Sequence, residues 1–284
     1  MSVNHYENFP VASLLCPPAW RPAIRAIYAY ARTADDLADE GAAGPAQRLT
    51  DLAAFESDLH AVASGKPPSA RWADVFEPLA EVIQRFALPL PLLTDLLSAF
   101  RQDVVQASYA ERTQLLDYCR RSANPIGRLL LHLQGIGGLD ALRESDAICT
   151  ALQLANFWQD LSLDTRRERL YIPLQDCARH GVAPASLLAG EDSARVRALV
   201  ADMVGWTRAL MRCGAPLVHR VGGRAGWELR LVTQGGLRIL QRIEDQGFDS
   251  LQRRPTLHWH DAVAMAWHAL RMRPPRAVAE REPA

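Results

Sequence analysis

Acidic residues gather near the end of the first predicted helix of this chain. Asp35, Asp36, Asp39 and Glu40 fall within six positions and follow Arg32. At spacings of three and four residues their carboxylates share one helix face, and like charges so placed destabilise a helix by about 0.2–0.5 kcal/mol per pair. Gly41 ends the helix just beyond, so the acids also lie at the negative end of its dipole. A divalent metal ion is the obvious partner, and a solvated acidic helix end is the alternative.

A second predicted helix, over 139–164, repeats this arrangement. Its polar stripe consists of Gln153, Asn156, Asp160 and Asp164, spaced three, four and four. The residues between are mostly apolar, and an unpaired buried polar group costs about 1–3 kcal/mol, so the stripe needs partners. On the first helix, over 19–40, the residues Tyr28, Arg32, Asp35 and Asp39 form a matching stripe, spaced four, three and four.

Two acid pairs that face each other would hold Mg²⁺. This ion binds one or two carboxylates and completes its shell with water and substrate phosphates. The candidate metal ligands are Asp35, Asp36, Asp39, Asn156, Asp160 and Asp164. Ions held there would clamp a diphosphate and neutralise it as its C–O bond breaks. Asp36 is also a candidate partner for a nearby arginine, as is Glu40.

The elements that position these residues are predicted to be helices throughout. Helical patterns span 19–40, 45–64, 71–86, 91–107, 110–135, 139–164, 192–220, 224–246 and 258–272. Pro125 interrupts the fifth pattern within Asn124–Gly127 and predicts a kink there. Residues 166–191 are predicted to be a loop with short turns. We expect an all-α protein, one domain over 1–284 with helices around a central apolar cavity, an N-terminal arm over 1–18 and a polar tail over 274–284.

Composition excludes several classes of protein. The 32 basic and 32 acidic residues form no basic stripe, so nucleic acid is not an expected partner. The five cysteines are odd in number and lack CxxC spacing, which favours a reduced cytosolic protein. No signal peptide is evident, and no apolar run reaches the roughly 18 residues of a membrane span. We therefore expect a cytoplasmic protein, with peripheral contact to the inner membrane surface open.

The paired motifs resemble those of the squalene/phytoene synthases, which act on isoprenyl diphosphates head to head. The family's first motif, Arg-x-x-Asp-Asp-x-x-Asp-Glu, is matched by residues 32–40, and its preceding aromatic residue by Tyr28. The second polar stripe matches the family's second motif. The resemblance covers essentially the whole chain. It implies the all-α isoprenoid synthase fold, diphosphate ionisation with two or three Mg²⁺ ions, and an apolar tunnel.

The resemblance assigns roles residue by residue. It implies catalytic roles for Tyr28, Arg32, Asp35, Asp39, Asp160 and Asp164. It implies substrate binding by His5, Phe9, Asn124, Gly127, Gln153, Asn156, Phe157, Arg169, Tyr171 and Arg253.

Departures from the family pattern indicate which subgroup of the family the chain resembles. Gln159 and Leu163 stand where the usual second motif has Arg and Glu, and Gly235-Gly236 falls near a position that often holds Tyr. With the opening Asn4–Pro10, these features resemble the bacterial subgroup that makes hydroxysqualene for hopanoids. That resemblance implies a carbon–oxygen lyase that ionises presqualene diphosphate and captures the rearranged cation with water, without NADPH. It also leaves open a transient contact with the enzyme that makes this substrate.

Other functions stay open at this stage. The chain could instead make presqualene diphosphate or squalene from farnesyl diphosphate, or make phytoene, and would then be a transferase. From a different class, it could be a catalytically dead helical scaffold of the same fold. Intact acid pairs on both helices argue against a scaffold, because a scaffold would gain stability by losing acids that repel each other. The backbone at Asn124–Gly127 and at Gly235-Gly236 is our hypothesis for the entry of water.

Overall fold

The computed structural model of the chain describes residues 16–272, and His5 and Phe9 lie outside this range. Its helices are α1 (Arg21–Asp39), α2 (Pro45–Ala63), α3 (Ala73–Phe86), α4 (Leu90–Val105), α5 (Arg112–Ser122), α6 (Asn124–Leu133), α7 (Leu139–Gln159), α8 (Leu161–Asp164), α9 (Leu174–Arg179), α10 (Pro184–Leu188), α11 (Ala194–Gly214), α12 (Leu217–Arg220), α13 (Gly223–Asp245) and α14 (Trp259–Arg271). Over 16–272 the only β-type pairing is an isolated parallel bridge between Ser108 and Leu170. The all-α prediction is confirmed.

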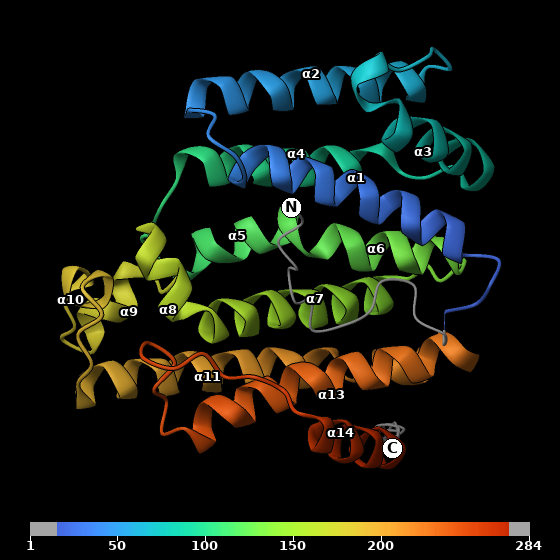
Figure 1. Ribbon diagram of the computed structural model, residues 1–284. Coiled ribbons are helices and arrows are strands. Elements are labelled where there is room, and N and C mark those ends of the chain that lie inside the picture. The colour runs from blue at the N-terminus through green and yellow to red at the C-terminus, as the bar shows by residue number, and fades with distance from the viewer. Residues whose placement is uncertain (1–15, 273–284) are drawn as a thin grey trace, which may run out of the picture.

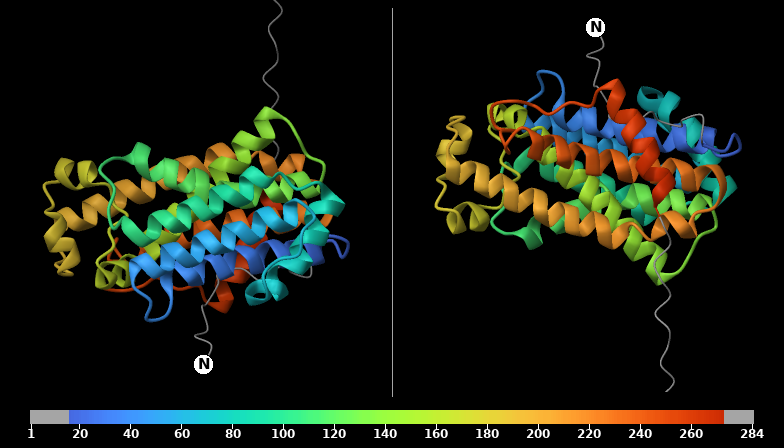
Figure 2. Two further views of the ribbon diagram at one scale, coloured as in Figure 1. Left: turned by 90° about the horizontal axis from the view of Figure 1, so that it is seen from above. Right: turned by 90° about the horizontal axis from the view of Figure 1, so that it is seen from below.

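The helices stack in layers (Figure 1). Helices α2 and α3 form one edge, α1 and α4 lie beneath them, α5 to α7 form the middle, and α11 and α13 cover α7 from the other side. Helix α14 lies at the far edge. Views from above and below show that most long helices run along the length of the molecule, whereas α14 crosses α13 obliquely (Figure 2). One apolar core is formed by residues of α1, α2, α3 and α4, and a second by residues of α5, α7, α11 and α13.

Three predicted helices are each divided in the structure. The kink expected at Asn124–Gly127 is a full break, because α5 ends at Ser122 and α6 begins at Asn124. Pro125 falls in the first turn of α6, where a helix needs no backbone donor. Likewise the helix expected over 192–220 ends at Gly214, and α12 starts after Pro216.

The prediction of one long helix over 139–164 is also wrong in its last turn. Helix α7 ends at Gln159, and Asp160 leaves the helical region with φ −95° and ψ 10°. The amide of Leu163 donates to the carbonyl of Asp160 at 2.7 Å, a three-residue hydrogen bond that tightens this turn. Asp160 and Asp164 therefore lie at a junction and on a short separate helix, not on one continuous stripe.

Helix α7 lies at the centre, and three neighbouring helices approach it through glycine. A Cβ at Gly127 of α6 would lie 2.5 Å from Cys149 Sγ, and one at Gly236 of α13 would lie 2.8 Å from Leu152 Cδ2. A Cβ at Gly214 of α11 would lie 2.6 Å from the Glu144 carbonyl oxygen. Real Cβ atoms do not come this close to other heavy atoms, so the distances between α7 and its neighbours depend on the missing side chains.

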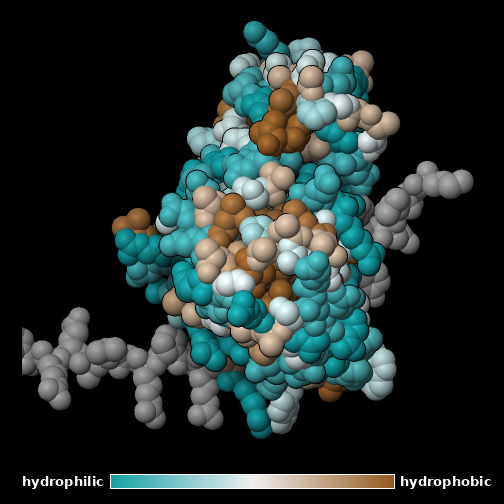
Figure 3. All heavy atoms as spheres, turned by 90° about the vertical axis from the view of Figure 1, so that its left-hand side faces the viewer, coloured by the Kyte–Doolittle hydropathy of each residue, from teal (hydrophilic) through white to brown (hydrophobic). Residues whose placement is uncertain are grey.

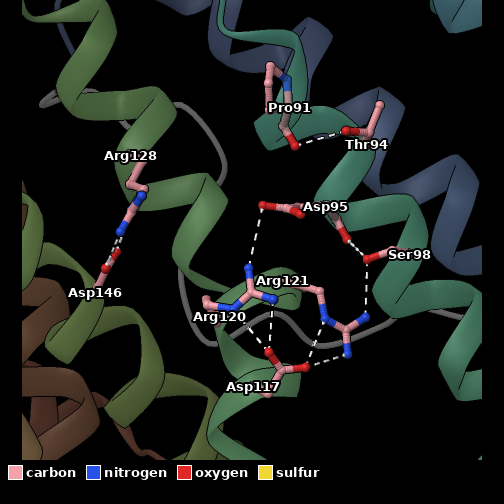
Figure 4. A network of polar contacts seen from close by, with 9 residues as sticks. All are labelled: Pro91, Thr94, Asp95, Ser98, Asp117, Arg120, Arg121, Arg128 and Asp146. Atoms are coloured by element: carbon pink, nitrogen blue, oxygen red, sulfur yellow. Dashed lines mark hydrogen bonds and ion pairs between the residues drawn. The ribbon is translucent and has the colours of Figure 1, made fainter.

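Ion pairs and hydrogen bonds help to fix the positions of the middle helices relative to one another (Figure 4). Arg128 of α6 binds both carboxylate oxygens of Asp146 of α7, at 2.9 and 2.6 Å. On α5, Asp117 accepts hydrogen bonds from Arg120 and Arg121, and Arg121 continues to the hydroxyl of Ser98 on α4. Partly exposed pairs of this kind contribute only about 0–1 kcal/mol each to stability. Their main effect is therefore on the relative positions of the helices.

The glycine contacts predict contrasting effects on stability. Gly214→Ala should lower the free energy of unfolding by about 1–3 kcal/mol, because its Cβ meets backbone atoms that cannot rotate away. Gly236→Ala should be nearly neutral, because it meets the flexible ends of Met211 and Leu152, and alanine favours the helix by about 1 kcal/mol. Chemical denaturation followed by circular dichroism measures both.

Gly205, also on α11, is the matched control because nothing lies within 4 Å of its hypothetical Cβ. Gly205→Ala should stabilise the protein through helix propensity alone, by about 1 kcal/mol. If Gly214→Ala were as stable as Gly205→Ala, the close approach of α11 to α7 would be refuted.

Candidate active site

An apolar cavity of about 470 Å³ lies between α1, α6, α7, α12 and α13. Its walls are mainly aliphatic side chains, among them Ile24, Ile27, Ile126, Leu130, Ile148, Leu152, Leu229 and Val232. Polar side chains in the lining include Gln134, Ser145 and Glu228. Such a cavity suits a hydrocarbon chain, because apolar surface removed from water gains about 25 cal/mol per Å².

Helices α1 and α7 both lead from this cavity to the acidic residues. Tyr28 and Ala31 line the cavity, and Asp35 follows Ala31 by one turn on the same face of α1. On α7, Leu152 lines the cavity and Asn156 continues that face. At 1.5 Å per residue, Asp160, which follows the last residue of α7, lies about 12 Å beyond Leu152. The acids therefore lie beyond one end of the cavity.

Three acids at the end of α1 share contacts with Arg32. Its guanidinium contacts Asp36 at 2.7 Å, Glu40 at 3.1 Å and Asp35 at 3.3 Å. Asp36 and Glu40 thus face an arginine, and Arg32 also holds Asp35. These groups are about a quarter to a half exposed, so each contact contributes little to stability, but together they fix the side chains at the end of α1.

Asp39 faces arginines from the other half of the site. Arg167 contacts its Oδ2 at 3.1 Å, and Arg169 hydrogen-bonds its Oδ1. Arg169 reaches this position because the segment after α8 is held against the segment after α4. There the amide of Leu170 donates to the carbonyl of Ala107 at 2.8 Å. The contacts join residues about 130 positions apart and bring the two acidic motifs together.

Asp160 faces an arginine that the sequence did not reveal. Arg254 Nε donates to Asp160 Oδ1 at 2.5 Å. The loop that carries Arg254 is held by Gln159, which is buried and donates to the carbonyl of Pro255 at 2.8 Å. Arg253, the arginine that the sequence suggested, is exposed and pairs with Asp249 instead. Gln159, a departure from the family motif, therefore positions a basic side chain beside Asp160.

Asp164 shows how closely the acids are gathered. Burial, followed by the carboxylate of Asp160, raises the pKa of Asp164 to about 7, while the guanidiniums of Arg169 and Arg167 act in the opposite direction. The carboxylate of Asp39 also raises this pKa, although it lies on α1. Acids from both motifs therefore repel one another, and a cation between them would relieve this repulsion.

The residue types fit a magnesium site, although the carboxylates face arginines in this structure. Oxygen donors from Asp and Asn side chains are those that Mg²⁺ takes. Within residues 16–272, no three His, Cys, Asp or Glu side chains are arranged as a ready group of metal ligands. Arg167, Arg169 and Arg254 contact the acids that would be needed.

Asp103 of α4 is a site residue that sequence reasoning missed. Burial raises its pKa to about 7; the Tyr118 hydroxyl and Arg169 lower it, and Asp35 and Asp39 raise it further. Tyr118 donates to Asp103 Oδ2 at 2.8 Å. The signal available in the sequence was an acid in the last turn of a mostly apolar helix, where the dipole disfavours it.

The tyrosine that binds this acid belongs to a cluster of aromatic rings. The rings of Phe157 and Tyr171 stack with centroids 3.7 Å apart and planes 7° apart. Tyr109 stacks on Tyr171 at 5.9 Å, and Tyr118 lies 6.3 Å from the same ring. Burial, followed by the carboxylate of Asp103, raises the pKa of Tyr171, so this cluster lies near the acids, and aromatic rings can stabilise cations.

The remaining predicted residues are more dispersed. Asn124 is buried and accepts a hydrogen bond from the Thr150 hydroxyl at 2.9 Å, so it joins α6 to α7. Gly127 lines the cavity. Gln153 is partly buried and Asn156 is exposed, both on α7. Gly236 packs against Met211 and Leu152 and is not among the lining residues, so its influence on the cavity passes through Leu152.

Comparisons with known proteins decide the family. The family model for squalene/phytoene synthases matches residues 3–261. The chain belongs to the squalene/phytoene synthase family. A phytoene synthase of Thermus thermophilus is 32% identical over 275 residues, which cover 96% of this chain and 91% of that protein. A hydroxysqualene synthase of Rhodopseudomonas palustris is 30% identical over 266 residues, 93% of this chain and 88% of that protein.

Solved structures agree with the family. The squalene synthase HpnC of Alicyclobacillus acidocaldarius superposes with a TM-score of 0.79 and 36% identity, over 86% of this chain and 90% of that chain. A dehydrosqualene synthase at 21% identity has a TM-score of 0.76 and shows the shared fold. The isoprenoid synthase fold implied by the motifs is therefore confirmed. Members of this family are enzymes that ionise prenyl diphosphates with divalent metal ions.

A search of the helices within residues 16–272 finds no segment with the length and apolar character of a membrane span.

The end of the molecule that carries α9 and α10 is shown in Figure 3, where hydrophobic residues gather near the middle of the face and hydrophilic residues surround them.

The pKa of Asp103 predicts a pH-dependent effect on stability without metal. The pKa of Asp103 is about 7 in the folded protein and about 3.9 in an unfolded chain. Between these two pH values the folded protein therefore binds more protons than the unfolded chain. Its free energy of unfolding therefore falls as pH rises through this window. Asp103→Asn should raise the thermal midpoint at pH near 8 and leave it nearly unchanged near 4, as measured by calorimetry. An equal effect at both pH values would contradict the raised pKa.

Proposed function

We propose that the protein is a hydroxysqualene synthase. It would ionise presqualene diphosphate, let the cyclopropylcarbinyl cation rearrange, and capture the cation with water to give hydroxysqualene and diphosphate. The observation that carries the proposal is the meeting of acids and arginines from α1, α4 and the segment after α7 beyond one end of an apolar cavity. The hydroxysqualene synthases among the relatives support it, including one of Zymomonas mobilis that is 39% identical over 177 residues.

Mg²⁺ would be held by the aspartates of α1 and by the polar residues at the end of α7. The proposed ligands are Asp35, Asp36, Asp39, Asn156, Asp160 and Asp164. Bound there, the ions would neutralise negative charge on the departing diphosphate. We propose that no NADPH takes part, because an alcohol product requires water and no hydride.

The arginines of the site would bind diphosphate oxygens. Arg32, Arg167, Arg169 and Arg254 are the guanidiniums that contact the acids, and a phosphate oxygen is an equally good acceptor for them. Charge-assisted hydrogen bonds of this kind are roughly twice as strong as neutral ones. The same groups that balance the carboxylates would hold the leaving group.

The hydrocarbon part of the substrate would occupy the cavity. Tyr28 on the cavity wall would face the cation and stabilise it by about 0.5–2 kcal/mol. Phe157 and Tyr171 stack on each other outside the lining, so a role for them would lie at the acidic end of the site. Gln134, Ser145 and Glu228 bring hydrogen-bonding groups to an otherwise apolar wall and are candidates to hold the capturing water. Gly127 lines the same wall and is consistent with water entering near Asn124–Gly127.

A second candidate is a transferase that condenses two prenyl diphosphates. The phytoene synthase of Thermus thermophilus matches over 96% of this chain and favours it. Both candidates need the same acids for diphosphate departure. They differ in whether a second prenyl chain or water reacts with the cation, so the identity of the product distinguishes them.

The decisive experiment supplies presqualene diphosphate and Mg²⁺ without reductant and identifies products by mass spectrometry. We expect hydroxysqualene and release of diphosphate. Asp35→Asn and Asp160→Asn should each lower turnover by at least about 10²–10³-fold, the usual loss when one charge-stabilising group is removed. Asp35→Asn should keep or raise thermal stability, because it removes one of several acids that repel each other.

Turnover of farnesyl diphosphate alone, with release of presqualene diphosphate or phytoene, would overturn the assignment in favour of the transferase. Full activity in both variants would refute the role of these acids in holding the metal ions.

Adjacent arginines provide a sharper test of the site. Arg254→Gln should lower kcat at least about 10-fold, because Arg254 lies beside Asp160 where the diphosphate would bind. Arg253→Gln is the matched control, since its side chain is 68% exposed and pairs with Asp249. Steady-state kinetics with a thermal melt for each variant measures the difference. Equal losses in both variants would place the diphosphate elsewhere.

A further inference from the structure

A basic cleft of about 300 Å³ lies between α11, α13 and α14. Helix α13 packs against both α11 and α14, and the three helices form one side of the molecule (Figures 1 and 2). The basic side chains that line the cleft are Arg208 and Arg212 of α11, Arg238 of α13 and His268 of α14. Within residues 16–272 no acidic residue lines it, although the whole chain has 32 basic and 32 acidic residues. The cleft therefore concentrates positive charge on a protein that has no formal net charge.

Two of these arginines are held in place through one nitrogen each. Arg238 Nε donates to the fully buried Asp261 at 2.6 Å, and Arg208 Nη2 donates to Glu244 at 2.7 Å. A guanidinium has five N–H donors, and no residue in 16–272 accepts a hydrogen bond from the other nitrogens of Arg208 or Arg238. An anion would therefore meet donors that are already fixed in position, which lowers the entropic cost of binding.

Arg212 has no carboxylate partner in the part of the chain that the structure describes. Its guanidinium forms no ion pair and no hydrogen bond with residues 16–272, and neither does the imidazole of His268. Arg212 follows Arg208 by one turn of α11, and like charges at this spacing repel each other. An anion beside the two guanidiniums would relieve this repulsion and accept charge-assisted hydrogen bonds from both.

The size and chemistry of the cleft favour a diphosphate group. Guanidiniums bind phosphate oxygens through paired N–H groups, and here they come from two helices. A carboxylate has two oxygens, whereas a diphosphate has more oxygens and more charge to share among three guanidiniums. Gln234 and Gln241 add carboxamide groups to the lining. The volume is at the lower limit of small-molecule sites, which suits a compact group.

The cleft is separate from the candidate active site. On α13 the apolar cavity is lined by residues up to Val232, whereas the cleft is lined by residues from Gln234 onward. No residue within 16–272 lines both, and the arginines that contact the acids of the active site do not line the cleft. A molecule in the cleft would therefore not occupy the place of the substrate.

We propose that this cleft is a second anion site, which binds inorganic diphosphate or the diphosphate group of a small soluble molecule. Arg208, Arg212 and Arg238 would hold the diphosphate oxygens, with His268 beside them. The proposal goes beyond the proposed function and does not depend on it, because the cleft uses neither the acids nor the apolar cavity.

The experiment follows the imidazole signals of the full chain, isotope-labelled in histidine, by NMR while inorganic diphosphate is added. A chelator removes divalent metal ions, which would themselves bind diphosphate. The signal that is absent from His268→Gln is assigned to His268. We expect this signal to shift and to saturate, and inorganic phosphate, which carries less charge, should bind more weakly.

Arg212→Gln should weaken the binding of diphosphate at least about tenfold, the usual loss when one hydrogen bond to a charged group is removed. Thermal melts should show this variant folded, because Arg212 is exposed and pairs with no residue in 16–272. The matched control is Arg71→Gln, since this side chain is also exposed and lies in the turn before α3, away from α14. It should bind diphosphate as the wild type does.

Arg254→Gln separates this proposal from the proposed function. It removes a guanidinium of the candidate active site and none from the cleft, so the titration of the His268 signal should be unchanged. A weaker titration in this variant would place the diphosphate in the active site instead.

Three further outcomes would overturn the proposal. One is a His268 signal that diphosphate does not move. Another is equal affinity of the wild type and Arg212→Gln, because the cleft would then not be where diphosphate binds. The third concerns lipid phosphate, which has the same chemistry. Phosphatidylglycerol vesicles should not compete with diphosphate for the His268 signal, and competition would make the ligand a lipid headgroup.

Discussion

The close approach of three helices to α7 is the constraint on which the rest of the structure depends. Gly127, Gly214 and Gly236 come from α6, α11 and α13, and a Cβ on any of them would displace a neighbouring atom, which at Gly214 belongs to the backbone of α7. Two of the residues they face, Cys149 and Leu152, also line the cavity. The close approach of these helices therefore places part of the wall of the apolar space. Because protein interiors are close-packed, such a wall resists movement in either direction.

The same helix delivers the charged end of the site. Helix α7 stops at Gln159, and the turn at Asp160 redirects the chain so that Arg167 and Arg169 reach Asp39 on α1. Carboxylates at helix C-termini are disfavoured by the helix dipole, and several of them together repel. Arginines from distant segments compensate for both effects. Ion pairs between its own residues hold the site in shape, but its acids outnumber these arginines, so a cation would relieve the repulsion that remains.

Much of this could be read from the sequence, because its signals were local. Helical periodicity and the spacing of Asp35, Asp39, Asp160 and Asp164 require only neighbouring residues, and they predicted an all-α protein with two acidic helix ends. Arg254 and Asp103 could not be found in this way. Arg254 contacts Asp160 across 94 positions, and Asp103 matters only because α4 packs against the end of α1. The break at Asp160 was missed because a polar stripe at helical spacing looks the same in one helix or two.

Helix α13 faces two environments at once. Glu228, Leu229 and Val232 line the cavity, whereas Arg230, Arg238 and Arg242 on other faces hold α14. The wall of the cavity and the anchor of α14 therefore belong to one helix. If a ligand in the cavity shifted α13, its ion pairs with Asp261 would shift α14 as well. Any molecule that bound α14 would then change the affinity for that ligand, and thermodynamic reciprocity would require the reverse effect to have the same factor.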